Sequence, residues 1–154
     1  MRREVVRRAP VFVTWAMRGH VWNLRAKRCL REIQRAFLVG RKSGFQVVHY
    51  AVLGNHVHML VEAEDGRALS RGMQGLAVRV ARSLQRVMGK TGSVFKERFH
   101  SRVLKTAGDV KRVRLYIANN ARRHYGAAEV AERDFAASQT PVHAPRTWIV
   151  RMSC

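Results

Sequence analysis

The segment from Phe45 to Ala63 constrains the fold more than any other part of the sequence. Two runs rich in β-branched and aromatic residues, FQVVHYAVL and HVHMLVEA, are separated only by Gly54 and Asn55. A two-residue connection of this composition between two apolar runs is typical of a β-hairpin. We therefore expect two antiparallel strands here, with His56 and His58 at the start of the second one.

The rest of the chain alternates strand patterns with helix patterns. The segment VFVTWAMR, residues 11–18, predicts a strand, and apolar residues at helical spacing predict helices over about 24–39 and 69–88. Short extended pieces come next, and Asp109 is a candidate N-cap for a further helix that ends near His124. This order predicts an α+β fold of the ferredoxin-like type, an antiparallel sheet with helices packed on one face.

Length and charge narrow the classes of protein to which the chain can belong. The 154 residues carry a formal net charge of +20. We expect a single domain over residues 1–154, with a core of about 11–126 and a tail of 127–154. The excess positive charge indicates a polyanionic partner, most often nucleic acid, with a ribosomal-type or membrane-surface binder as the alternative. No run approaches the length of a membrane span and no signal sequence is recognisable, so we expect a cytoplasmic protein without a membrane partner.

The predicted helix over 69–88 has an apolar stripe on one side and arginines on the other. A solvated arginine face is the ordinary explanation, but residues 66–128 hold fifteen Lys and Arg against two acids. Nearby carboxylates therefore cannot neutralise the face, and we predict a surface that contacts phosphates. Trp15, Trp22 and Tyr125 are candidates for stacking on unpaired bases. The candidate nucleic-acid-binding residues are Arg79, Arg82, Arg86, Lys96, Arg98, Arg102, Arg112 and Arg123.

The pair formed by His56 and His58 suggests a metal site. Residues two apart in a strand point to the same face and lie about 6.5 Å from each other, so both imidazoles can converge on one ion. Val57, between them, faces the other way. Histidines on a sheet can also simply form hydrogen bonds, and two ligands rarely hold a catalytic ion, so the metal interpretation requires a third ligand.

A third ligand is available in the helix predicted after Asp109. Tyr116 and Asn120 are four residues apart and project from the same face of that helix. An amide oxygen can bind a metal ion, and a tyrosine hydroxyl beside a metal-held phosphate can act as a nucleophile. A packing tyrosine and a helix that ends early at its asparagines are the ordinary alternatives. A phenol is protonated at neutral pH, and His124, farther along the helix, is a candidate proton acceptor.

Three segments, NHVHMLVE, GSVFKERFHSRVL and LYIANNARRH, occur in this order at residues 55–62, 92–104 and 115–124. In their order and spacing they resemble the REP-associated tyrosine transposases, which belong to the single-tyrosine HUH transposases. The resemblance covers roughly residues 11–126. It implies a ferredoxin-like fold with the two histidines on a central strand and the tyrosine helix packed beside it.

The resemblance also implies an activity, the metal-dependent cutting and rejoining of single-stranded DNA at or near palindromic hairpin repeats. On this view His56, His58 and Asn120 hold a Mg2+ or Mn2+ ion. Tyr116 attacks the scissile phosphate, and the products are a 5'-phosphotyrosine and a free 3'-hydroxyl. The partner is single-stranded or hairpin DNA, and the protein is a monomer or a homodimer. An inactive hairpin-binding protein of the same fold is the alternative, and an RNA-binding protein explains the charge but neither histidine.

Overall fold

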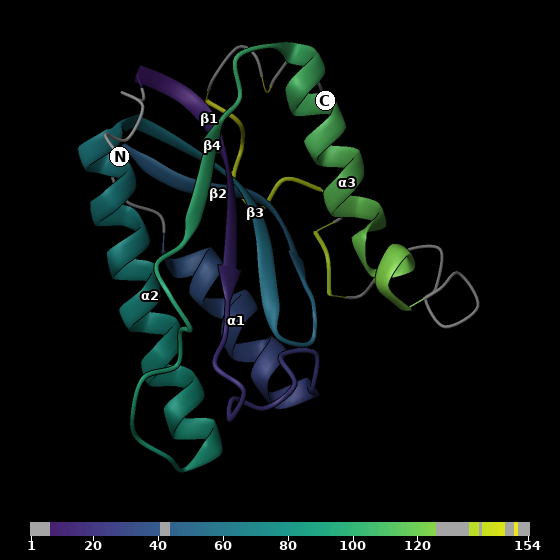
Figure 1. Cartoon of the computed structure of the whole chain (residues 1–154). Coiled ribbons are helices and arrows are strands. Elements are labelled where there is room, and N and C mark those ends of the chain that lie inside the picture. The colour runs from purple at the N-terminus through teal and green to yellow at the C-terminus, as the bar shows by residue number, and fades with distance from the viewer. Residues whose placement is uncertain (1–6, 41–43, 126–135, 139, 147–149, 151–154) are drawn as a thin grey trace.

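The computed structural model describes residues 7–40, 44–125, 136–138, 140–146 and 150. The described strands form one antiparallel sheet in the order β2-β3-β1-β4, with helices on either side of it (Figure 1). In chain order the elements are β1 (Arg7–Ala16), α1 (Lys27–Val39), β2 (Phe45–Val52), β3 (His56–Asp65), α2 (Gly66–Met88), β4 (His100–Val103) and α3 (Ala107–Tyr125).

The hairpin predicted from the 45–63 segment is confirmed. β2 and β3 pair antiparallel from Val52 opposite Val57 to Phe45 opposite Ala63, with an irregularity in register between Val47 and His49. The Leu53 backbone N–H donates to the His56 carbonyl at 2.9 Å and so closes the turn. The two histidines therefore begin β3, which lies between β2 and β1 in the middle of the sheet.

The alternation of side chains along the strands separates two faces of the sheet. The residues of β3 at odd positions, from Val57 to Ala63, join the larger apolar cluster together with α1 and α2. Leu60 belongs instead to a second cluster, which also holds Val113 and Ile117 of α3. The α+β antiparallel class is confirmed, but the helices cover both faces and not one, because the second face also carries apolar residues that must be buried.

The helix ends follow local capping chemistry. The Asp65 carboxylate accepts a hydrogen bond from the Ala68 N–H at 2.7 Å, so α2 begins at Gly66. The helix ends at Met88, and its C-cap Gly89 has a φ of 64°, a left-handed conformation that glycine adopts without steric cost.

The start of α3 differs from the prediction that Asp109 is its N-cap. The helix begins at Ala107, and Asp109 lies inside the first turn. Thr106 is the residue before the helix, and its hydroxyl accepts from the Asp109 N–H at 3.1 Å while the Asp109 carboxylate accepts from the Thr106 N–H at 3.2 Å. This reciprocal pair is a capping box. The hydrogen bond from Thr106 also lowers the pKa of the Asp109 carboxyl.

The described part of the predicted tail lies along β2 and covers the outer edge of the sheet. The buried Glu62 carboxylate accepts from the Arg146 N–H at 2.8 Å, and His49 Nδ1 lies 3.2 Å from the Ser138 hydroxyl. Burial, and then the charge of Arg114, lowers the pKa of His49 to about 4, so the ring is neutral at this contact. An edge strand paired in this way offers no template for another chain. The backbone hydrogen bonds run from Val52 N–H to Ala136, from Ser138 N–H to Tyr50 and from Val142 N–H to Val48.

Candidate active site

His56 and His58 project from β3 toward the face of the sheet that α3 covers. Their ring centroids are 4.8 Å apart and the rings are nearly perpendicular. Val57 belongs to the apolar cluster on the opposite face. The expected geometry of the pair is therefore present, with His58 buried and His56 partly exposed.

Each histidine is held at Nδ1 by an oxygen atom. His56 Nδ1 lies 2.8 Å from Asn55 Oδ1, and His58 Nδ1 lies 3.1 Å from the hydroxyl of Thr14 on β1. Because an amide oxygen only accepts hydrogen bonds, this contact favours the His56 tautomer with its proton on Nδ1, which leaves Nε2 as the nitrogen suited to metal binding. The Thr14 hydroxyl can support the same tautomer of His58, and such contacts orient imidazole ligands in metal sites.

Tyr116 on α3 lies directly over the second histidine. The ring centroids of Tyr116 and His58 are 5.3 Å apart, and Phe12 of β1 contacts both rings. Phe12 stacks on His58 at 5.6 Å and meets the edge of Tyr116 at 5.9 Å. The tyrosine and the histidine pair, which are far apart in sequence, thus form one aromatic cluster.

Asn120 lies one helical turn after Tyr116 and is fully buried. Neither its amide oxygen nor its amide nitrogen has a hydrogen-bond partner among the described residues. The next residue, Ala121, packs against Leu53 at the end of β2, beside the turn that leads to the histidines. A buried amide without a partner costs roughly 1–3 kcal/mol, so its presence calls for a functional explanation.

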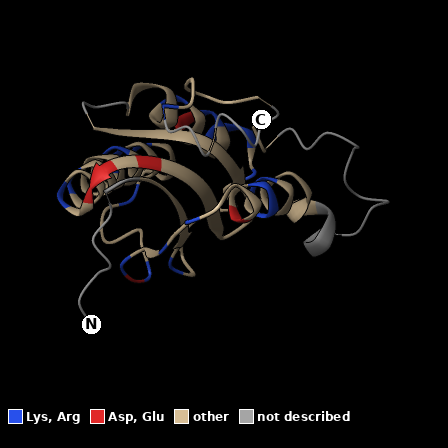
Figure 2. Ribbon diagram, turned by 90° about the horizontal axis from the view of Figure 1, so that it is seen from above, with Lys and Arg blue, Asp and Glu red and all other residues tan. Residues whose placement is uncertain are grey.

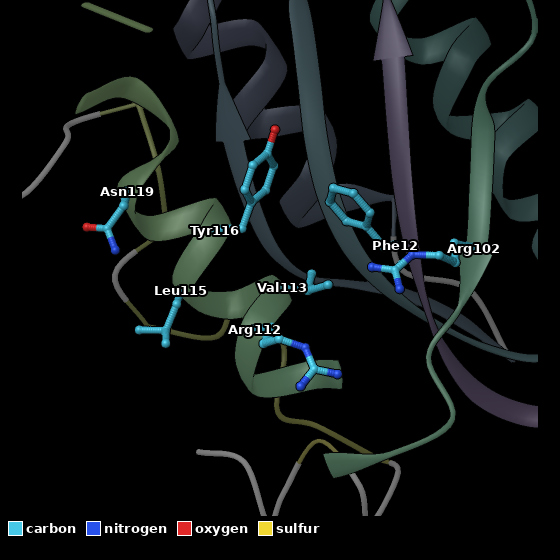
Figure 3. A pocket seen from close by; sticks show the side chains of 7 residues that line it. All are labelled: Phe12, Arg102, Arg112, Val113, Leu115, Tyr116 and Asn119. Carbon is cyan, nitrogen blue, oxygen red and sulfur yellow. The ribbon is translucent and has the colours of Figure 1, made fainter. Parts of the chain in front are cut away.

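An open groove of about 600 Å³ adjoins Tyr116 between α3 and β4. Phe12 forms part of its wall, and two arginines reach into it from opposite sides, Arg102 from β4 and Arg112 from α3 (Figure 3). The strand register explains the first of these, because Arg102 pairs with Phe12 and shares its face of the sheet. The remaining lining residues are Val113, Leu115 and Asn119.

The other candidate nucleic-acid-binding residues lie farther from this cluster. Arg79, Arg82 and Arg86 are exposed on α2, which packs on the opposite face of the sheet. Arg86 also lies 3.6 Å from the Glu32 carboxylate, so α1 supplies one acid that the sequence analysis did not anticipate. Figure 2 shows the basic positions on helices at both sides of the sheet, with few acidic positions between them.

The segment before β4 carries further candidates at the edge of the sheet. Lys96 and Arg98 are exposed, and Arg98 lines a second groove on the α2 side. His100 is exposed beside Glu97, with 3.1 Å between Nε2 and the carboxylate. The side chains of Arg123, His124 and Tyr125 lie outside the described residues.

Two of the aromatic candidates for base stacking differ in exposure. Trp15 is buried and stacks on Phe95 at 4.2 Å, so it is a packing residue, whereas Trp22 is 42% exposed. The sequence analysis did not select Phe12 or Thr14, although both contact His58. Their alternation on β1 places them on one face, but only the pairing with β3 identifies that face as the one with the histidines.

Comparison with known proteins identifies the family. The family model described as "Transposase IS200 like" matches residues 8–120. No curated protein matches the chain. The fold is similar to a solved structure of a REP-associated tyrosine transposase bound to a REP hairpin, at a TM-score of 0.66 and 17% identity over 83% of this chain and 75% of the other.

A second solved structure, of a Deinococcus radiodurans R1 protein assigned as a transposase, matches at a TM-score of 0.50 and 17% identity. That match covers 77% of this chain and 95% of the other.

In the part of the chain that the structure describes, no helix is both long and apolar enough to cross a membrane. Because the family model spans most of the sequence, the chain belongs to the IS200-like transposases.

Proposed function

We propose that this transposase cleaves and rejoins single-stranded DNA at palindromic hairpin repeats, with Tyr116 as the nucleophile. The observation that carries the proposal is the contact between Tyr116 and His58, with 5.3 Å between ring centroids, on the face of the sheet that also holds His56. A packing tyrosine needs neither a histidine pair beside it nor a buried amide one turn away. The solved relative bound to a REP hairpin supports hairpin DNA as the substrate class.

The proposed reaction exchanges one phosphodiester for another. The Tyr116 hydroxyl oxygen bonds to the scissile phosphorus, and the bond between phosphorus and the 3'-oxygen breaks. The hydroxyl proton passes to a base, for which His124 is our candidate, and the leaving 3'-oxygen takes up a proton to become a hydroxyl. Since the phosphotyrosine bond is of the same kind as the bond it replaces, attack by a 3'-hydroxyl reseals the strand without ATP.

The residues present fit a divalent cation. Among the described residues, no group of three or more His, Cys, Asp or Glu side chains could hold a metal ion, so a third ligand must be of another type. The Asn120 amide, buried and without a hydrogen-bond partner in the described chain, suits this role. We propose that His56, His58 and Asn120 hold Mg2+ or Mn2+. When bound, such an ion stabilises the negative charge that a phosphate gathers during in-line attack.

The ligand chemistry has a bearing on which ion binds more tightly. Imidazole nitrogens suit transition ions better than magnesium, which prefers oxygen ligands. Mn2+ is therefore the better probe for binding measurements.

Covalent capture tests the proposal. Labelled single-stranded DNA that carries the palindromic repeats flanking the gene is incubated with the protein and Mn2+ or Mg2+, beside the Tyr116→Phe variant. We expect a labelled protein band on a denaturing gel for the wild type alone. If neither protein gives a band while both bind the same DNA tightly, the chain is an inactive hairpin-binding protein and the proposal is wrong.

A further inference from the structure

We propose that the groove between α3 and β4 binds one unstacked nucleotide of the single strand next to the phosphate that is cut. In this arrangement the base packs on Phe12 and the phosphate lies between Arg102 and Arg112. The inference rests on the proposed function, since it assigns a binding subsite beside the proposed nucleophile.

The groove has the size and the location for such a ligand. Its volume of about 600 Å³ lies within the range of roughly 300–1,000 Å³ that is usual for sites binding small molecules. Tyr116 forms part of its wall, so a nucleotide held there is joined to a phosphate close to the tyrosine. The groove is open to solvent, as a site for one unit of a continuous strand must be.

The apolar part of the groove can receive a base. Phe12 is half-buried and is fixed by its contacts with His58 and Tyr116, so its ring is already ordered before DNA binds. Leu115, on the α3 wall, is 54% exposed and adds apolar surface beside Phe12. Stacking on an aromatic ring tolerates any base, so the subsite fixes the path of the strand and not its sequence.

The charged part of the groove can receive a phosphate. Arg102 is exposed, and within the described part of the chain it pairs with no carboxylate. Arg112 contacts the Asp109 carboxylate, but the Arg112 side chain is 74% exposed and the pair is screened by solvent. In Figure 3 the Arg102 side chain extends toward Phe12, while Arg112 extends from α3 into the same opening. Arg102 is therefore the stronger phosphate ligand of the two.

A cycle between protein and DNA variants tests the base contact. Hairpin substrates receive one abasic residue at each position within three nucleotides of the cut, and covalent capture is timed for the wild type and for Phe12→Leu. We expect Phe12→Leu to slow capture of intact DNA by about 5- to 150-fold, the range that corresponds to loss of one stacked base. At one position, the abasic residue should slow capture by the wild type as much as Phe12→Leu slows capture of intact DNA. The same abasic residue should not slow capture by Phe12→Leu any further.

Several controls separate a base contact from a structural role of Phe12. Phe12→Trp should restore the rate on intact DNA, and Mn2+ affinity should be the same in all Phe12 variants. Because Phe12 packs against the second apolar cluster, all rates are compared per folded molecule. Phe99→Leu changes a partly exposed aromatic residue that packs on the opposite face, and should leave capture unchanged. Losses that multiply at every abasic position, or a loss of Mn2+ affinity, would overturn the inference.

The phosphate contact has its own matched pair of variants. For binding to single-stranded DNA, the slope of log K against the logarithm of the salt concentration should become shallower by about 0.7 in Arg102→Ala, the contribution of one phosphate contact. Arg31→Ala removes the same charge from an exposed position on α1, outside any proposed site, and should leave the slope unchanged. Equal slopes for Arg102→Ala and the wild type contradict the phosphate contact.

Failure of this inference can be told apart from failure of the proposed function. If the wild type forms no covalent product, the proposed function is wrong. The Phe12 variants and the abasic substrates are then compared by their affinity for the hairpin with its single-stranded extension. Non-additive losses in affinity at one abasic position still support the subsite, and additive losses at all positions reject it.

Discussion

The two faces of the sheet are built for different purposes. The face toward α1 and α2 holds the larger apolar cluster, with residues such as Val61 and Leu84 completely or almost completely buried. The face toward α3 holds a smaller apolar cluster and the histidine pair, and it leaves an open groove at one side. Polar groups that cost stability are gathered on the second face, so the first must supply most of the stability that the fold needs.

The largest expected effect in this comparison comes from the first face. Leu84→Ala removes a fully buried side chain from α2 and should lower the free energy of unfolding by about 2–5 kcal/mol, through lost burial and a residual cavity. Chemical denaturation measures the change. Covalent capture per folded molecule should stay at the wild-type level, because Leu84 packs on the face of the sheet opposite to α3. A loss of capture larger than the unfolded fraction explains would show that the two faces are not independent.

A smaller effect of opposite sign is expected on the second face. Asn120→Leu replaces a buried amide, which has no hydrogen-bond partner in the described chain, with an apolar side chain of similar size. The free energy of unfolding should rise by about 1–3 kcal/mol, while Mn2+ binding and covalent capture are lost. Calorimetry with and without Mn2+ gives the free energy of unfolding and the Mn2+ affinity, and the denaturing gel measures covalent capture.

The neighbouring asparagine provides the control for this stability change. Asn119 is exposed, and Asn119→Ala should change the free energy of unfolding by no more than about 0.5 kcal/mol. If Asn120→Leu is strongly destabilising instead, the amide is a structural group and the proposed ligand set is wrong.

The smallest effect concerns the arginines on the outside of α2. Replacing Arg79 and Arg82 together should reduce the salt dependence of hairpin binding by about 0.9 for each lost duplex contact, because fewer counterions are released. The rate of covalent capture at saturating DNA should not change, since both residues lie across the sheet from Tyr116. An unchanged salt slope would mean that the hairpin binds elsewhere on the protein.

The sequence was most informative where the relevant interactions are local. The Gly54–Asn55 turn and the apolar runs around it predicted the β2–β3 hairpin, and the i, i+2 spacing predicted that the histidines share a face. The start of α3 was placed too late, because Asp109 serves a capping box from inside the helix and not the cap position itself. Asp and Thr are both favoured at the N-cap, with Asp the stronger, so the pattern alone pointed to Asp109 and not to Thr106.

The sequence by itself determined the class of fold, the strand that carries the histidines, and the helix that carries Tyr116 and Asn120. These follow from side-chain periodicity and turn chemistry, which act over a few residues. Only the tertiary structure decided that α3 packs opposite α1 and α2, that Phe12 and Thr14 contact His58, and that Arg102 faces the groove beside Tyr116. Those contacts join residues distant in the chain, and they depend on strand register and on which apolar surfaces each helix can bury.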